Sequence, residues 1–472
     1  MALSASSAPS FDTKVFDPKM SDAEGLMWRM EKDPYLSSTF GNVTILDRKP
    51  DFERLVRRME LATWMVPRLR QRVHSAPANL TSPTWVMDSN FDIHYHVRHI
   101  ALPKPGTMRQ LLDLASLITN DAFDRTRPLW QFVIVDGLRG GKSALIEKLH
   151  HTIADGEGMV QLSLAFLDFD PDAADPPSLA AVPDLDDDVP AHHTGSNGDV
   201  LRGIMTSSLR MPLGMLRQMK GLIADPTQIP SAGTAAADTV RGVINQLSDV
   251  DQARSPLWTK RSLQRRIETL RAPYHETRAV AKKLGGKLNT AFLTVAAEGA
   301  SRYHIELGAP VELLRSSMAI STRSEKSGAN AFSLVRMLIP TGAMPIADRF
   351  EAIQQASSAA RGGSSSASLD TLAAVASTLP TSLVTRLART QAQTVDFATS
   401  NVKGSPIPMY LAGAQMLENY AIGPLGGVAF NLTLLSYLGS LDMGINIDTA
   451  AVERPELLAS CLSGAFKDFL AL

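Results

Sequence analysis

Two adjacent histidines followed by an Asp-Gly pair form the pattern in this chain that is best suited to chemistry. Residues 149–156 read LHHTIADG. A histidine has an ordinary pKa of about 6.5, so it can take a proton from a hydroxyl or amine that attacks a thioester. The pattern therefore predicts a general base for acyl transfer.

The sequence around the histidines predicts a strand before them and a helix after them. Residues 143–149 are short, rich in apolar side chains and preceded by the glycines of 137–141, which indicates a strand entered from a hairpin turn. Side chains alternate along a strand, so His150 and His151 cannot both line one channel if the strand runs to its last histidine. We expect one of them to be the base and the other to pack.

The residues after the histidines are expected to shape the site. Residues 157–167 are apolar nearly all round and predict a buried helix. Asp155 falls near its N-cap and can hold the loop through a cap or an ion pair with an arginine, while Gly156 permits a tight turn. Backbone N–H groups at the start of this helix could also face a developing oxyanion.

The motif resembles the HHxxxDG signature of the bacterial wax ester synthase/diacylglycerol acyltransferase family, part of the chloramphenicol acetyltransferase-like superfamily. Condensation domains of nonribosomal peptide synthesis carry a similar signature. The flanking sequences favour the first family: FDIHYHVRH at 91–99, RPLW at 127–130, TSNVKG at 399–404 and PMYLAGA at 408–414. The resemblance spans almost the whole chain. It implies an α/β fold of two chloramphenicol acetyltransferase-like domains with a substrate tunnel between them.

The resemblance also implies a reaction and roles for residues. It implies an O-acyltransferase that moves a long-chain acyl group from acyl-CoA to diacylglycerol or a long-chain fatty alcohol, giving triacylglycerol or wax ester. His151 would be the general base, His150 its supporting neighbour, and Asp155 with Gly156 the pair that shapes the loop. The resemblance implies no metal or redox cofactor, no covalent acyl-enzyme, and acyl-CoA as a substrate.

Three departures from the family pattern bear on activity. The family's Asn-Asp pair is Asn289-Thr290 here, its Pro-Leu-Ser-x-x-Asp is represented only by residues 20–22, and Lys403 replaces a proline. These changes leave the base intact but allow altered substrate choice or low activity. Two alternatives therefore stay open: a catalytically weak paralogue that binds lipid surfaces, and a condensation enzyme that depends on a carrier protein.

Composition indicates a large enzyme of more than one domain. The chain has 472 residues, 44% of them hydrophobic and 20% charged. A segment rich in Pro, Ala, Asp and Ser begins at Asp168 and predicts a solvated acidic linker. We therefore expect an N-terminal acyltransferase domain over 1–170, a linker over 171–200 and a C-terminal acyltransferase-like domain over 201–472.

Charge, cysteine content and hydropathy limit the classes of partner and the cellular location that we expect. A net charge of −1 argues against nucleic acid as the main partner. The single Cys461 excludes an internal disulfide and a thiolate metal cluster, is consistent with a reducing cytoplasm, and is expected to be structural. No leader pattern and no apolar run of about 18 to 20 residues is evident. We expect a cytoplasmic protein that reaches lipid from the surface, with peripheral attachment to the inner membrane face or to lipid inclusions and droplets left open.

A basic amphipathic pattern over 201–223 fits either contact with an anionic lipid surface or packing against its own domain.

Residues 359–368, rich in Gly, Ser and Ala, predict a loop between helices. Asn401 and Gly404 are expected in a turn before a strand rather than at substrate. Residues 127–136 predict a buried strand that packs beneath the histidine strand.

Three patterns suggest ligand sites that we do not favour. Residues 137–143 suggest a phosphate-binding loop, but Asp136 stands where that motif requires glycine, and a hairpin turn fits better. His94, His96 and His99 could bind zinc from a strand, although no cysteine completes the set. Residues 192–193, a His-His pair beside aspartates, are expected to be surface rather than a metal site.

Overall fold

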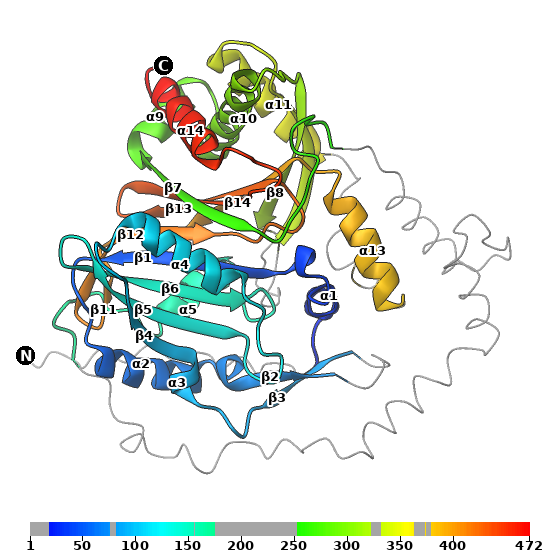
Figure 1. Cartoon of the computed structure of the whole chain (residues 1–472). Helices are drawn as coiled ribbons and strands as arrows, with labels where there is room; N and C mark the ends of the chain where they lie inside the picture. Colours follow the sequence, from blue (N-terminus) through cyan, green and yellow to red (C-terminus); the bar gives the residue numbers. More distant parts are fainter. Residues whose placement is uncertain are drawn as a thin grey trace, which may run out of the picture.

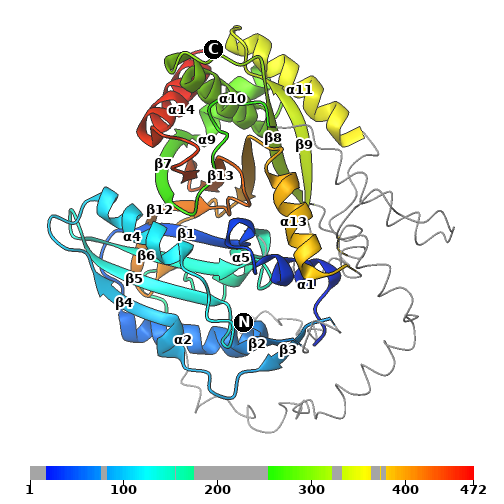
Figure 2. The same ribbon diagram turned by 45° about the vertical axis from the view of Figure 1, so that its right-hand side comes forward.

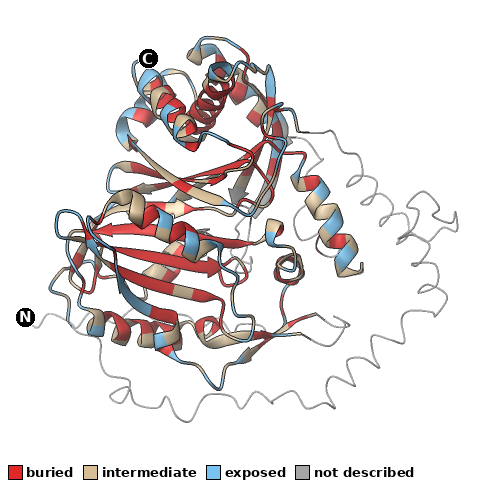
Figure 3. Ribbon diagram, in the orientation of Figure 1, coloured by how far each residue is buried: buried red, intermediate tan, exposed pale blue. Residues whose placement is uncertain are grey.

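Two six-stranded sheets form the frame of the molecule, and they lie one above the other in Figure 1. The structure, a computed structural model, describes residues 18–75, 82–154, 156–174, 253–321, 332–362, 373 and 379–472. Each sheet carries helices and has its own buried core, visible as the red segments in Figure 3. The expected α/β fold with two similar halves is confirmed, and we refer to the halves as the N-lobe and the C-lobe.

The N-lobe sheet has the strand order β11-β12-β1-β6-β5-β4. Its strands are β1 (Thr39–Leu46), β4 (Val97–Ala101), β5 (Trp130–Leu138), β6 (Lys142–His150), β11 (Tyr410–Leu411) and β12 (Ala414–Ile422). A small ribbon, β2 (Gln71–His74) with β3 (Thr84–Met87), lies apart from this sheet. The helices of this lobe are α1 (Asp22–Met30), α2 (Phe52–Met65), α3 (Ile93–His96), α4 (Met108–Asn120) and α5 (Gly156–Ser163).

The C-lobe sheet has the order β7-β14-β13-β10-β8-β9. Its strands are β7 (Arg265–Pro273), β8 (Leu313–Ser321), β9 (Phe332–Pro340), β10 (Phe397–Lys403), β13 (Phe430–Tyr437) and β14 (Ser440–Asp448). Helices α9 (Tyr274–Lys283), α10 (Leu288–Glu306), α11 (Ile346–Gly362) and α14 (Pro455–Leu470) cover its outer face, while α13 (Thr381–Ala392) lies beside α1 of the N-lobe (Figure 2).

Local sequence explains where the elements near the histidines begin. β5 and β6 form the predicted hairpin, and its turn contains Gly140 and Gly141 at φ 81° and 74°, a region that glycine adopts at little cost. Ser21 caps α1 in a reciprocal capping box with Glu24, so residues 20–22 mark a helix start. The hairpin interpretation of residues 137–143 is therefore confirmed over a phosphate-binding loop.

The C-terminal half of the sequence contributes to the N-lobe sheet. β12 pairs antiparallel with β1, and the chain then returns directly into β13 of the C-lobe. Gly444 of β14 allows β12 to approach closely, because a Cβ there would overlap the carbonyl oxygen of Ala421. The strands before residue 175 that belong to the two large sheets lie in the N-lobe sheet, and those after residue 252 lie in the C-lobe sheet except for β11 and β12. The division into domains at 171–200 stays a prediction.

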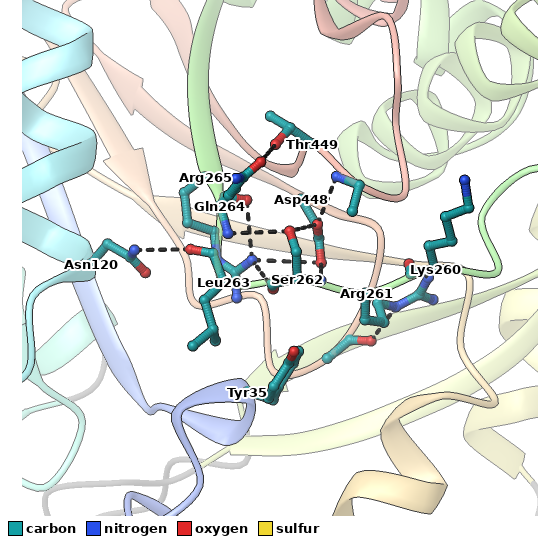
Figure 4. Close-up of polar contacts among 12 residues, drawn as sticks. Tyr35, Asn120, Lys260, Arg261, Ser262, Leu263, Gln264, Arg265, Asp448 and Thr449 are labelled. Atoms are coloured by element: carbon teal, nitrogen blue, oxygen red, sulfur yellow. Dashed lines mark hydrogen bonds and ion pairs between the residues drawn. The ribbon is translucent and has the colours of Figure 1, made fainter.

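Polar contacts also join the lobes along α4 and the start of β7. Asn120 donates a hydrogen bond to the carbonyl oxygen of Leu263 at 3.0 Å (Figure 4). Ser262, next to it, donates through its backbone N–H and its hydroxyl to Asp448, at 2.7 and 2.6 Å. Arg109 pairs with Glu268 at 2.8 Å. The buried Asp448 carboxylate therefore holds residues 262–263 in place, the segment that α4 contacts through Asn120.

Several sequence predictions about elements need correction. Residues 93–96 form a short helix rather than a strand, because Asp92 caps them through the N–H of His94. The helix after the histidines ends at Ser163 rather than 167. Residues 359–362 continue α11 instead of forming a loop. β5, predicted to pack beneath the histidine strand, instead pairs with it edge to edge in one sheet.

Asp168, the predicted first residue of the solvated linker, is buried. Its carboxylate pairs with Arg58 at 2.5 Å and Arg54 at 3.4 Å, and its backbone bridges to Tyr410. The sequence signal was compositional and did not include the two arginines of α2. Residues 175–252, which include the remaining linker, the pair at 192–193 and the basic pattern at 201–223, lie outside the described residues.

No helix among the described residues is long and apolar enough to cross a membrane.

Candidate active site

His150 ends the β6 strand, His151 follows it, and the two side chains face opposite sides of the N-lobe sheet. His150 is the last strand residue and is 1% exposed. His151 follows it and lines a cavity on the other side of the sheet. The alternation that the sequence predicted is therefore present: one histidine packs and the other reaches the cavity. Which of them acts as a base is a matter of chemistry and stays a prediction.

His150 is held on both ring nitrogens. Its Nε2 donates to the Glu31 carboxylate at 3.0 Å, and its Nδ1 accepts from the Thr152 hydroxyl at 2.8 Å and from the Thr152 backbone N–H at 3.2 Å. These contacts fix the ring and its tautomer. His150 is thus a buried, oriented neighbour of His151, and its supporting role stays a prediction.

Glu31 joins the two histidines to the start of β1. Its carboxylate accepts from the Ser37 hydroxyl at 2.6 Å and from the Ser38 N–H at 2.9 Å, and the Ser38 carbonyl accepts the His151 N–H at 3.1 Å. Burial acts to raise the Glu31 pKa, but the hydrogen bond and charge of His150 and the two serine donors outweigh it and lower the pKa to about 2. Glu31 is therefore ionised at neutral pH and anchors the backbone on which His151 sits.

The cavity beside His151 lies between the lobes and has a volume of about 500 Å³. Its walls come from α1, α5, β1 and β6 of the N-lobe sequence and from α13, β10, β12 and β13. Most of the lining is apolar: Leu26, Met27, Met30, Phe40, Leu145, Met159, Leu164, Leu387, Leu425, Val428 and Leu435. The size is within the usual range for ligand sites, and the lining suits an alkyl chain. This is the expected position of a substrate channel between two halves.

Phe40 is an aromatic neighbour of His151. The two ring centroids are 4.7 Å apart with the planes tilted by 41°. Phe40 is on β1 opposite Leu149, so the imidazole sits where β1 and β6 meet at the cavity wall. The base candidate therefore contacts an apolar surface on one side and the cavity on the other.

A small group of polar side chains interrupts the apolar wall. Glu147 of β6, Asn42 and Thr44 of β1 and Asn419 of β12 line the cavity and form one hydrogen-bonded group, which we call the polar cluster. Burial raises the pKa of Glu147 to about 7, although the hydrogen bond from Asn42 acts in the opposite direction. Sequence reasoning missed this cluster. The signal was the alternation of polar Asn42 and Thr44 with apolar Val43 and Ile45 in β1, but alternation alone does not show which face is buried.

The other predicted loop residues have mixed outcomes. Asp155 lies outside the described residues, and Gly156 is the first residue of α5. Their role in shaping the loop, and oxyanion binding by the start of α5, stay predictions. α5 nevertheless begins five residues after His151 and lines the same cavity, so its N-terminus is close to the histidine in the chain.

The region around residue 401 reaches the cavity, contrary to prediction. Asn401 is inside strand β10 rather than in a turn, and both Asn401 and Gly404 line the cavity. The Asn401 amide also donates to Asn289, the second residue of α10. Thr290, where the family pattern has a carboxylate, is buried in the first turn of α10. The Asn289 position is therefore connected to the cavity wall through Asn401.

The three histidines of the disfavoured zinc site at 94–99 do not converge on one point. His96 is buried between Phe91 and Trp130, and burial lowers its pKa to about 4 despite its hydrogen bond to the Trp130 carbonyl. His99 pairs instead with Asp136 at 2.7 Å. No group of three potential metal ligands is present in the described part of the chain. Cys461 is buried in α14, in agreement with a structural role.

Comparisons with known proteins agree with this geometry. Residues 20–292 match the wax ester synthase/diacylglycerol acyltransferase catalytic domain, and residues 328–469 match the C-terminal domain of the same family. A protein of Mycobacterium tuberculosis, provisionally named a diacylglycerol O-acyltransferase, is 31% identical over 96% of this chain and 93% of its own length. A second M. tuberculosis protein with the same kind of name is 28% identical over 86% of each chain.

Solved structures show the same fold at lower identity. The wax ester synthase/diacylglycerol acyltransferase of Marinobacter aquaeolei has a TM-score of 0.63 at 19% identity, over 96% of this chain and 100% of that one. The starter condensation domain of rhizomide synthetase, solved with C8-CoA and Leu-SNAC, has a TM-score of 0.56 at 11% identity, over 97% and 94% of the two chains. These likenesses show the shared fold. The matched catalytic and C-terminal domains and the 31% identical relative show that the chain belongs to the wax ester synthase/diacylglycerol acyltransferase family.

Proposed function

We propose that this protein transfers a long-chain acyl group from acyl-CoA to the hydroxyl of diacylglycerol or of a long-chain alcohol. The observation that carries the proposal is the position of His151, whose side chain lines an apolar cavity built by both lobes. An alkyl chain is favoured in such a cavity because burying apolar surface is favourable. The membership of the family and the names of the M. tuberculosis relatives support the same reaction class.

In the proposed mechanism, His151 takes the proton of the acceptor hydroxyl as its oxygen attacks the thioester carbonyl. The carbon–sulfur bond then breaks, the new ester forms, and the proton passes from the imidazole to the departing CoA thiolate. His150 and Glu31 hold the backbone and the neighbouring ring in place through the contacts described above. We assign no step to a metal or redox cofactor and no covalent intermediate to the protein.

The test measures release of CoA from palmitoyl-CoA with diacylglycerol or hexadecanol as acceptor, together with the identity of the lipid product. We expect turnover by the wild type and a loss of about 100-fold or more in His151→Ala, in line with the usual contribution of a general base. His94→Ala is the matched control, since His94 is an exposed histidine away from the cavity lining.

Either of two results would reject the proposal. Turnover that persists in His151→Ala would remove the base assignment. A folded wild type that shows no turnover with either acceptor would favour the alternatives of lipid-surface binding or carrier-dependent condensation. The departure of this chain from the family pattern at Asn289-Thr290 is compatible with both alternatives.

A further inference from the structure

Arg336 is the single arginine or lysine among the described residues that line the cavity between the lobes. It lies on β9, the edge strand of the C-lobe sheet, and its side chain is exposed. Figure 2 shows this edge of the sheet, where β8 and β9 lie next to α13. A side chain that lines the cavity and also reaches solvent lies at an opening of the cavity. Arg336 therefore marks one mouth of an otherwise apolar channel.

The strand pairing places a hydroxyl next to Arg336 on the cavity side of the sheet. Arg336 lies opposite Ser317 of β8, and Ser317 lies opposite Ala398 of β10. All three residues line the cavity. Ser317 is 7% exposed, and its hydroxyl forms no hydrogen bond within the described part of the chain. A serine hydroxyl can donate one hydrogen bond, so this group can serve a ligand that enters beside Arg336.

No carboxylate of the described residues pairs with Arg336. Its hydrogen bond among these residues runs from Nη1 to the side-chain oxygen of Gln391 on α13, and a guanidinium has five N–H donors. Arg315 lies two residues before Ser317 on the same face of β8. Partial desolvation and the charge of Arg315 both lower the pKa of Arg336, although the group stays charged. Two neighbouring cations at a cavity mouth favour an anion there.

We infer that Arg336 and Ser317 bind a phosphate group of a substrate at this mouth of the cavity. A guanidinium can donate two parallel hydrogen bonds to phosphate oxygens, and the Ser317 hydroxyl can donate a third. Acyl-CoA has the required chemistry, because its phosphates lie at the end of the molecule remote from the acyl chain. The inference rests on the proposed acyl transfer for the identity of this substrate.

The spacing of the strands separates this site from the region of the histidine. α5 begins five residues after His151 and contacts β10. β9 is two strands away from β10, which corresponds to about 10 Å along the sheet. A phosphate at Arg336 therefore belongs to a part of the substrate distant from the reacting thioester, as in CoA. A phospholipid headgroup offers the same chemistry from a lipid surface, and the experiment separates these two sources.

Binding measurements on the full chain test the site without turnover. The probes are hexadecyl-CoA, a thioether that cannot transfer its chain, S-hexadecyl pantetheine, which lacks the phosphates, and vesicles of phosphatidylglycerol or phosphatidylcholine. Arg336→Gln removes the charge, Arg336→Lys keeps it, and Ser317→Ala removes the hydroxyl. Arg386→Gln is the matched control, because Arg386 is an exposed arginine of α13 outside the cavity lining.

We expect Arg336→Gln to weaken binding of hexadecyl-CoA by about tenfold or more, the usual scale for a hydrogen bond to a charged group. Binding of S-hexadecyl pantetheine should stay unchanged. Arg336→Lys and Ser317→Ala should show smaller losses, and Arg386→Gln should match the wild type. This result assigns the site to the phosphates of CoA. A loss confined to phosphatidylglycerol vesicles supports the phosphate site and assigns it to a lipid headgroup.

Unchanged binding of hexadecyl-CoA and of phosphatidylglycerol vesicles by Arg336→Gln overturns the inference. If this variant does not fold, the wild type still decides, because an ion pair at an exposed mouth must weaken as salt rises. Affinity for hexadecyl-CoA that equals the affinity for S-hexadecyl pantetheine, together with vesicle binding that does not depend on salt, also overturns it. A protein that binds hexadecyl-CoA through Arg336 but shows no acyl transfer would contradict the proposed function and leave this site standing.

Discussion

Replacing Glu147 with glutamine should make the protein more stable at alkaline pH and leave its stability almost unchanged at acidic pH. The folded pKa is about 7 because burial disfavours the carboxylate, while the unfolded chain has the ordinary value of 4.5. The folded state therefore holds a proton that the unfolded state releases. The stability that this proton provides is fully present below pH 4.5 and is lost as the pH rises through 7.

The magnitude follows from the two pKa values. Each pKa unit corresponds to about 1.4 kcal/mol, so ionised Glu147 costs the folded state about 3 kcal/mol at pH 8. Most of this penalty develops between pH 5 and pH 8. Glutamine has nearly the same shape, accepts the hydrogen bond from Asn42 and carries no charge, so the variant escapes the penalty.

The assay is urea unfolding at pH 5, 6.5 and 8, followed by tryptophan fluorescence. Four of the five tryptophans, at positions 28, 64, 85 and 130, are in the N-lobe sequence, so the signal reports mainly on the lobe that contains Glu147. Glu53→Gln, at an exposed site in the first turn of α2, controls for the loss of a carboxyl. A stability difference that is constant with pH, or that shrinks as the pH rises, would refute the burial argument.

Two further predictions concern the supports of the site. Glu31→Gln should lower the free energy of unfolding by about 3 kcal/mol at pH 7, because the pKa falls from 4.5 to about 2 on folding. This loss of stability is fully present above pH 4.5 and disappears as the pH falls through 2. The difference in free energy of unfolding between wild type and variant, measured by urea titration, should therefore be larger at pH 7 than at pH 3. Equal differences at the two pH values would contradict the prediction. Gly444→Ala should destabilise by about 1–3 kcal/mol, because the added Cβ overlaps Ala421 on β12. A thermal melt checks this, and an unchanged unfolding temperature would show that β12 can move.

The sequence predicted the histidine arrangement because local rules governed it. Side chains alternate along a strand, so a strand that runs up to the two histidines places them on opposite faces, and the glycines before it favour the hairpin turn. The strand, the turn and the helix after it are all close in sequence. The partner of His150 was not predictable in this way, because Glu31 is 119 residues away and meets it only through tertiary packing.

The errors near the cavity have the same cause. Asn401 was expected in a turn, but β13 pairs with the whole of β10, opposite Leu434 at Asn401, and draws this segment into the sheet. Asp168 was expected in solvent because acidic residues follow it, but two arginines of α2 bury and pair its carboxylate. In each instance, a partner distant in sequence overrides the local composition.

The crossing of β12 explains why the cavity belongs to both halves of the chain. β12 extends the N-lobe sheet next to β1 and continues through residues 423–429 into β13, which lies in the C-lobe sheet. The polar cluster takes Asn419 from β12 and Asn42 from β1, so one wall of the channel already contains residues from both halves. An isolated N-terminal half would lack β12 and leave the edge of β1 without its partner, which is an unfavourable arrangement for a sheet. The two lobes are therefore separate cores that share one cavity, and the wall of the cavity that His151 lines is complete only when both lobes are present.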